Sequence, residues 1–287
     1  MKLLQPINIT LTTTNVPETD YPEWAVGTTY ALEDRVIVAS EHNVYESLAS
    51  SNLGNTPSTS PDKWALVGKT NAYKCIDDKV STQTTNATSI IMTFPTLKST
   101  SIAFLNVECS TIKVEVLEGT TVIFEEERVG LSRDTLGWYS YFFGDFTFKN
   151  FFLFEHLYNP TATYRITLTG DLCKLGVMTM GTIFEIGCTN INSSLGFVDY
   201  SKKDIDQWGE TYLKEGVYRD YFRGEVTIEK GKLEIVKKIL RDRRGKLSLF
   251  MPSTVYDMTI YGYAQEPELI WQEFDKSICS FDIQGVS

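Results

Sequence analysis

Four carboxylate side chains lie close together in the sequence, at Asp199, Asp204, Asp206 and Glu210. Glycoside hydrolysis requires two carboxyl groups that face a sugar from positions several ångströms apart. The sequence does not fix that separation, and acidic stretches are commoner on solvated surfaces than in active sites. We therefore interpret this stretch as a solvated loop and keep glycoside hydrolysis as an alternative.

The other residues that could carry chemistry form no recognisable constellation. The chain has two histidines, His42 and His156, and neither lies in a nucleophile or metal motif. His42 fits a solvated polar turn, and His156 fits the end of a strand. Asp77 and Asp78 lack the glycine and the spaced carboxylates of a calcium loop, which favours a turn. We expect a protein that is not an enzyme and that uses no cofactor and no metal.

The five cysteines are scattered and odd in number, and they form no CxxC pair. This pattern fits neither a disulfide framework nor a zinc site, so we expect reduced thiols in a protein made in a cytoplasm. The beginning of the sequence, MKLLQPINIT, has no apolar stretch of signal-peptide length. No later stretch approaches the length that spans a membrane, so we expect no membrane insertion.

Length and composition predict two or three β-rich units. The chain has 287 residues, of which 42% are hydrophobic, 22% charged and 13% aromatic. Short runs rich in Thr, Val, Ile and aromatic residues suit pleated, half-buried surfaces. The net charge of -10 argues against nucleic acid or an anionic membrane as the main partner.

Changes in residue composition and pattern divide the sequence into four regions. Residues 1–20 read as an extended N-terminal arm or edge strand, because a threonine-rich run precedes Pro17. Residues 21–69 read as a compact aromatic module dominated by turns. Evenly spaced short strands in residues 70–187 predict an antiparallel β-sandwich, at 90–94, 101–107, 111–117, 121–126, 138–143, 151–154, 163–168 and 174–180. Within 111–117 the alternation of apolar and charged residues predicts a strand with one face in water.

Residues 188–287 predict an α+β assembly domain with one amphipathic helix. Leu233, Val236, Ile239 and Leu240 recur at helical spacing, and Gly245 ends the segment. Candidate strands surround the helix, at 222–229, 246–250, 258–263 and 277–283.

The helix ends in a basic cluster, which the helix dipole alone could explain. Our alternative is a contact with an acidic neighbouring subunit. The candidate interface residues are Lys237, Arg241, Arg243 and Arg244.

The aromatic module has a recognisable spacing, W-x5-Y-x3-D-x-V-x8-Y-x11-P-x6-W. It is formed by Trp24, Tyr30, Asp34, Val36, Tyr45, Pro57 and Trp64. This order is similar to the small chitin-binding-type carbohydrate modules of chitinases, cellulases and tail proteins of bacterial viruses. The resemblance implies a small twisted antiparallel β fold whose large aromatics supply much of the core.

The same resemblance implies candidate sugar contacts at Tyr30, Tyr45 and Trp64, of which Tyr30 is the best. The segment after Tyr45 lacks the exposed aromatics that stack on sugar in that family, and Glu33 replaces a glycine. The leading interpretation is therefore that these rings belong to the core of the module. The rest of its framework is formed by Trp24, Asp34, Val36 and Pro57.

A broader resemblance covers the remaining chain. The segments IAFLNVECSTIKVEV, GWYSYFF and SLGFVDYSKKD, in this order, look like those of minor tail or tail-tip proteins of tailed bacteriophages and prophages. The resemblance implies a galactose-binding-like jelly roll for the middle region. It also implies a location in the virion tail after synthesis in the cytoplasm of the bacterial host.

The partners implied are other virion proteins, further copies of this chain, and a glycan of the host surface. The leading hypothesis is a structural tail component. The main alternative is an adhesin that recognises a receptor or polysaccharide, followed by a glycoside hydrolase.

Overall fold

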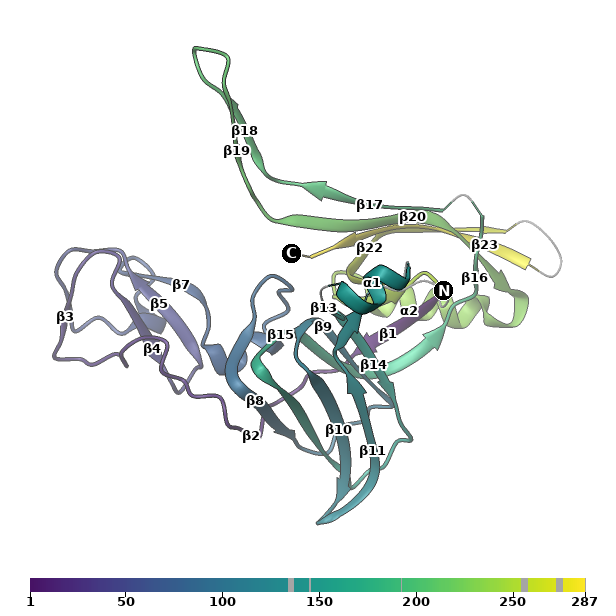
Figure 1. The fold of residues 1–287 in the computed structure, drawn as a ribbon, viewed down its shortest axis with the longest axis horizontal. Helices are drawn as coiled ribbons and strands as arrows, with labels where there is room; N and C mark the ends of the chain where they lie inside the picture. Colours follow the sequence, from purple (N-terminus) through teal and green to yellow (C-terminus); the bar gives the residue numbers. More distant parts are fainter. Residues whose placement is uncertain (134–136, 145, 192, 254–257, 272–275, 287) are drawn as a thin grey trace.

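The computed structural model describes residues 1–287 except 134–136, 145, 192, 254–257, 272–275 and 287. Strands make up most of the described chain, and every pair of named strands is antiparallel. The prediction of a mainly β protein with a helix near the C-terminus is therefore confirmed. A small unit stands at one end of the molecule, and two larger units lie against each other (Figure 1).

The small unit contains the aromatic module. One sheet has the order β4-β5-β7, and a second pairs β3 with β6. Short 3-10 helices lie within this unit, at Pro57–Thr59, and directly after it, at Asn71–Ile76. The strands are β3 (Thr29–Tyr30), β4 (Arg35–Val38), β5 (Asn43–Ser47), β6 (Asn52–Leu53) and β7 (Trp64–Lys69).

The middle unit is built around one long strand. Strand β15 (Thr163–Glu185) pairs along its first part with β10 and β8, and along its second part with β9. The two separate strands predicted at 163–168 and 174–180 are thus one strand with a register shift between Thr169 and Leu172. The other strands are β2 (Thr13–Thr14), β8 (Thr84–Phe94), β9 (Ser101–Glu108), β10 (Thr111–Glu118), β11 (Thr121–Val129) and β14 (Phe151–Glu155).

Alternation along the strands explains the core of the middle unit. Ile112, Val114 and Val116 of β10 all face inward and are buried. The prediction that the opposite face of β10 is wet is wrong at Glu115, which is buried. Neighbouring strands cover that carboxylate, and Arg165 on β15 and Lys113 on β10 itself pair with it.

The first strand of the N-terminal segment is not at an edge of the sheet. Strand β1 (Lys2–Pro6) lies between β15 and β21, so it is a central strand of the large sheet. Leu3 and Leu4 point to opposite faces, as successive strand residues must, and both are fully buried. The prediction of an edge strand is therefore wrong for β1, but it is right for β2 (Thr13–Thr14) in the threonine-rich run, which pairs with β8 alone.

The C-terminal unit combines a sheet with helix α2 (Leu233–Asp242). Val236 and Ile239 of α2 are buried against Val226, Phe281 and other apolar residues of the sheet, which confirms the predicted amphipathic helix. The strands are β16 (Cys188–Thr189), β17 (Ser194–Asp199), β20 (Tyr218–Glu229), β21 (Ser248–Met251), β22 (Ile260–Trp271) and β23 (Lys276–Gly285).

The middle and C-terminal units share a core of their own. Ala103 and Leu105 of β9 meet Leu249 of β21 and Tyr261 of β22 in one buried cluster. The Tyr261 hydroxyl donates a hydrogen bond of 2.6 Å to Asp78, across the same junction. Because β1 also pairs with a strand of each unit, the two units form a continuous 14-stranded sheet.

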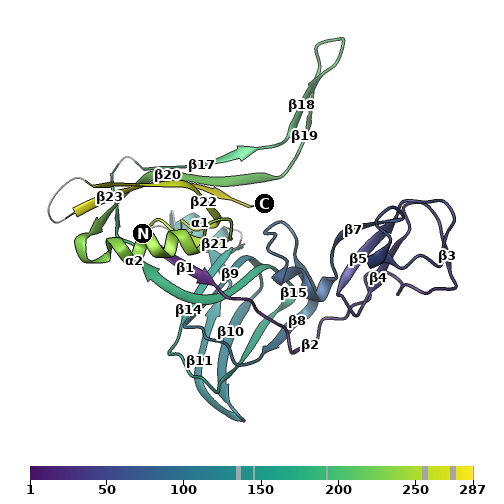
Figure 2. The same cartoon turned by 180° about the vertical axis from the view of Figure 1, so that it is seen from behind.

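Two chain segments, which we call excursions, extend away from the large sheet. The first is a long hairpin in which β18 (Lys202–Ile205) pairs with β19 (Thr211–Lys214) beyond the ends of β17 and β20. Figure 2 shows it projecting from the C-terminal unit. The second contains β12 (Leu131–Arg133), helix α1 (Trp138–Phe143) and β13 (Phe146–Phe148).

The strand predicted at 138–143 is therefore wrong, because the segment is helix α1. Its aromatic residues favour strands, but β12 and β13 pair with each other and α1 lies between them. Helical spacing instead brings Trp138 over Phe142 and Tyr139 over Phe143, and these pairs of rings are in contact.

Candidate assembly surfaces

The three candidate sugar contacts lie in the core of the aromatic module. Tyr30 and Tyr45 are 7% exposed and Trp64 is 2% exposed. The Tyr30 and Trp64 rings meet edge to face, with their centroids 5.2 Å apart. Stacking on a sugar requires an exposed ring face, so this arrangement supports the core interpretation of all three residues.

Polar ends of the same side chains are hydrogen-bonded inside the module. The Tyr30 hydroxyl accepts a bond of 2.8 Å from the Ala25 amide, the Tyr45 hydroxyl donates to Glu41 at 2.8 Å, and the Trp64 indole donates to the Asn55 carbonyl at 2.9 Å. Each ring is therefore held in one orientation.

The remaining framework residues also have structural roles. Asp34 accepts a 2.6 Å hydrogen bond from the Ala31 amide, which closes the turn before β4. Val36 is buried, and Trp24 is partly buried against the same core. Pro57 is buried at the first position of its 3-10 helix, where it needs no amide donor.

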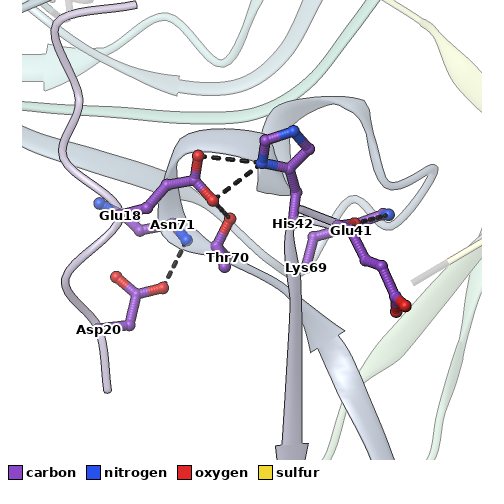
Figure 3. A network of polar contacts seen from close by, with 7 residues as sticks. All are labelled: Glu18, Asp20, Glu41, His42, Lys69, Thr70 and Asn71. Carbon is purple, nitrogen blue, oxygen red and sulfur yellow. Dashed lines mark hydrogen bonds and ion pairs between the residues drawn. The ribbon is translucent and has the colours of Figure 1, made fainter. Parts of the chain in front are cut away.

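A polar network joins the module to the chain on both sides of it (Figure 3). Glu18 lies between His42 and Thr70, with both carboxylate oxygens 3.0 Å from His42 Nδ1 and one accepting a 2.8 Å bond from the Thr70 hydroxyl. Asp20 accepts a 2.5 Å bond from the Asn71 amide. We call Glu18, Asp20, His42, Thr70 and Asn71 the latch. His42 therefore takes part in a hydrogen-bonded network and does not simply lie in a solvated turn.

The basic cluster divides into exposed and internal residues. Lys237, Arg241 and Arg244 are exposed on and after α2, as an interface requires. Arg243 instead donates to Ser248 Oγ at 3.0 Å, to the Pro6 carbonyl at 3.4 Å and to the Leu247 carbonyl. Burial lowers the pKa of Arg243. Arg243 therefore has a structural role inside the chain, and Lys237, Arg241 and Arg244 are the stronger candidates for an interface.

The hairpin arm, residues 194–218, exposes many apolar side chains. Its outer part has only two strands, β18 and β19, and every residue of these two strands is exposed. Trp208, at the tip, is 81% exposed. The other exposed apolar and aromatic residues of the arm are Leu195, Phe197, Val198, Tyr200, Ile205, Tyr212, Leu213, Val217 and Tyr218.

The four carboxylates considered for hydrolysis lie on this arm. Asp199, Asp204 and Glu210 are exposed, and Asp206 accepts hydrogen bonds from the amides of Trp208 and Glu210. The prediction of a loop is wrong for Asp199 and Asp204, which lie in β17 and β18. The exposure of these carboxylates still favours a solvated surface over a glycoside-hydrolysis site.

The second excursion carries another exposed aromatic group. Trp138 is 83% exposed, and Tyr139 and Phe143 are also exposed. Single exposed apolar residues are ordinary on protein surfaces, but contiguous groups of this kind mark interaction sites. The aromatic run GWYSYFFGDFTF could have indicated this surface from the sequence. The same residue types are equally typical of a buried core, so the run alone does not predict exposure.

A cavity of about 500 Å³ lies where the arm joins the two large units. Its lining includes Leu105 and Phe151 from the middle unit and Tyr218 and Tyr261 from the C-terminal unit. Burial and the hydrogen bond to Asp78 raise the pKa of Tyr261. Tyr261 therefore remains a neutral donor, which suits a structural role at the junction.

His156 follows the end of β14, as predicted, and is buried beside Phe124 and Tyr164. Burial lowers its pKa, so the neutral ring is favoured. The described residues contain no group of three or more metal-binding side chains.

All five cysteines are free, and Cys188 alone among them is exposed. Burial raises the pKa of Cys75 to about 12, which favours its thiol form. No helix in the described part of the chain has the length and apolar character needed to cross a bilayer.

Comparison of the chain with protein-family models, curated proteins and solved structures gives no match.

Proposed function

We propose that the chain is a non-enzymatic structural component of a bacteriophage tail or tail tip. It is made in the bacterial cytoplasm and assembles in the virion with other tail proteins and with further copies of itself. The aromatic module is presented toward the host surface. The proposal rests on the resemblance of the sequence to minor tail proteins and on the exposed surfaces of the structure.

The single observation that carries the proposal is the hairpin arm. A two-stranded ribbon with exposed Phe197, Trp208 and Tyr212 gains little from folding by itself, because these side chains stay exposed. A neighbouring subunit would bury these rings. The arm therefore supports a role in assembly more directly than any other part of the described chain.

The structure of the module favours a structural role over sugar binding. None of its aromatic residues is fully exposed, because Tyr30, Tyr45 and Trp64 are buried and Tyr21 and Trp24 are half-buried. Its exposed large residues are aliphatic, such as Val26, Leu32 and Leu66. Pyranose stacking uses flat aromatic faces, which these residues lack. We infer that the module descends from a chitin-binding-type fold and that the middle unit corresponds to a galactose-binding-like jelly roll.

Analysis of purified virus particles tests the proposal. Particles from the bacterium whose virus or prophage encodes the chain are purified, their proteins are identified by mass spectrometry, and antibody against the chain is located by electron microscopy. We expect the chain in stoichiometric amounts and the label on the tail. A chain found free in lysates and missing from intact particles would overturn the proposal.

A further inference from the structure

The tip of the hairpin arm is an ordered, acidic and aromatic surface. Asp206 accepts hydrogen bonds of 2.8 and 2.9 Å from the amides of Trp208 and Glu210, and Gly209 provides the positive φ of the turn. Asp204 and Glu210 are exposed and lie within four residues of Trp208 in the sequence. The tip therefore presents an apolar centre with negative charge around it.

The outer surface of α2 has the opposite character. Lys237, Lys238, Arg241 and Arg244 are exposed there, together with Ile235, which is 57% exposed. In the described part of the chain, none of these four cations lies within 4.0 Å of a carboxylate oxygen. Glu234 and Asp242 are also exposed on α2, so its outer surface presents an apolar residue and an excess of positive charge.

One molecule cannot bring its own two surfaces together. Strand β20 runs from Tyr218, at the base of the arm, to Glu229, just before α2. Its 12 residues span about 36 Å of extended chain. Figures 1 and 2 both show the arm leaving the sheet at the end opposite α2.

We infer that the arm tip of one copy docks on the outer surface of α2 in the next copy. This inference rests on the proposed function and names one of its partners. Trp208 packs beside Ile235, and the carboxylates of the tip meet the cations of α2. An apolar anchor inside a ring of complementary charge is the usual anatomy of a protein interface.

Such a contact joins two different surfaces, so a pair of copies keeps one free tip and one free helix. Repetition therefore produces a ring if the rotation closes and a filament if it does not. The charges also make the contact weaken as salt increases.

A charge-exchange experiment with the full chain tests the contact. The tip variant carries Asp204→Lys and Glu210→Lys, which spare the turn-forming Asp206. The helix variant carries Lys237→Glu and Arg241→Glu, which spare the internal Arg243. Glu127→Lys, on exposed β11, is the matched control. Sedimentation velocity is measured over a range of concentration and salt, and thermal melting monitored by circular dichroism checks folding.

We expect wild type and control to self-associate at low salt. Each double variant alone should associate at least tenfold more weakly. An equimolar mixture of the two should recover association, because the basic tip of the tip variant fits the acidic helix of the helix variant. The unchanged acidic tip of the helix variant likewise fits the unchanged basic helix of the tip variant.

Failure of the mixture to associate would overturn the inference. Wild-type self-association that neither double variant weakens would also overturn it, while the proposed function would stand with its contact elsewhere. A wild type that stays monomeric but binds short duplex DNA through α2 would replace the second copy by nucleic acid. Only absence from virus particles would overturn the proposed function itself.

Discussion

His42 lies face to face on Tyr73, with the ring centroids 3.7 Å apart and the planes 16° apart. Tyr73 belongs to the 3-10 helix that follows the module, so the stack holds a module loop against the connection to the middle unit. Glu18 then holds His42 from the preceding segment. The latch therefore fixes the module at both of its ends.

Removing the latch should loosen the module without unfolding it. We expect Glu18→Gln to raise the rate of proteolytic cleavage near residues 68–72 about fivefold, since the loss of one hydrogen bond costs about 1 kcal/mol. Glu23→Gln, an exposed change on the module, is the control and should leave the rate unchanged. Equal protection of all three proteins would show that the latch does not hold the module.

Truncating Trp64 should unfold the module alone. The indole is buried and hydrogen-bonded to Asn55, so Trp64→Ala should cost about 3–5 kcal/mol in this small unit. Two-dimensional NMR should then lose the dispersed signals of 21–69 and keep those of the large sheet. Loss of both sets would show that the module and the sheet fold together.

Tyr30 is unsuitable for an alanine test of sugar binding, because its loss damages the module core. Tyr30→Phe keeps the ring and removes only the hydrogen bond from Ala25, at a cost of about 1 kcal/mol. We therefore expect a glycan array to give the same result for wild type and Tyr30→Phe. Specific binding that is abolished in this variant would favour the adhesin alternative.

Acid should weaken the middle unit through Glu115. Hydrogen bonds from Arg165 lower the pKa of this buried carboxyl, against the effect of burial, and Lys113 lowers it further. In the unfolded chain the carboxyl titrates at its ordinary pKa, so the unfolded state binds the proton more readily. The stabilisation is therefore present above the unfolded pKa and is lost as pH falls through the folded pKa.

Urea unfolding between pH 7 and pH 3 measures this contribution. We expect Glu115→Gln to lower the free energy of unfolding by about 1–3 kcal/mol at neutral pH, and by progressively less as the pH falls. Glu127→Gln should follow the wild-type curve. A deficit of Glu115→Gln that stays constant across the pH range would refute the assignment.

Arg243 and Arg241 should behave differently although they are close in sequence. Arg243→Ala leaves the carbonyls of Pro6 and Leu247 without their donor and should lower the free energy of unfolding by about 1–3 kcal/mol. Arg241→Ala, on the exposed surface, should change it by less than about 0.5 kcal/mol. Similar losses in both would contradict the division of the basic cluster.

Elements with a clear local pattern could be predicted from the sequence. The spacing of Leu233, Val236 and Ile239 predicts α2 because a helix repeats its buried face every three to four residues. The framework of the module could also be predicted, because its aromatic spacing reflects a core that few other residues could build.

Long-range pairing could not be predicted. Leu3 and Leu4 give no sign that β1 lies between two units, because that position depends on partners more than 150 residues away. The exposure of the hairpin arm could not be predicted for a different reason. The apolar alternation of the arm is that of a half-buried strand, and only the structure shows its exposure.

The most direct test of the central claim is sedimentation equilibrium of the full chain beside a chain without the arm. Residues 200–217 are replaced by a two-residue Asn-Gly turn between Asp199 and Tyr218, which are paired across β17 and β20. We predict that wild type forms oligomers while the shortened chain, with an unchanged melting temperature, is monomeric. A shortened chain that assembles as well as wild type would contradict the account.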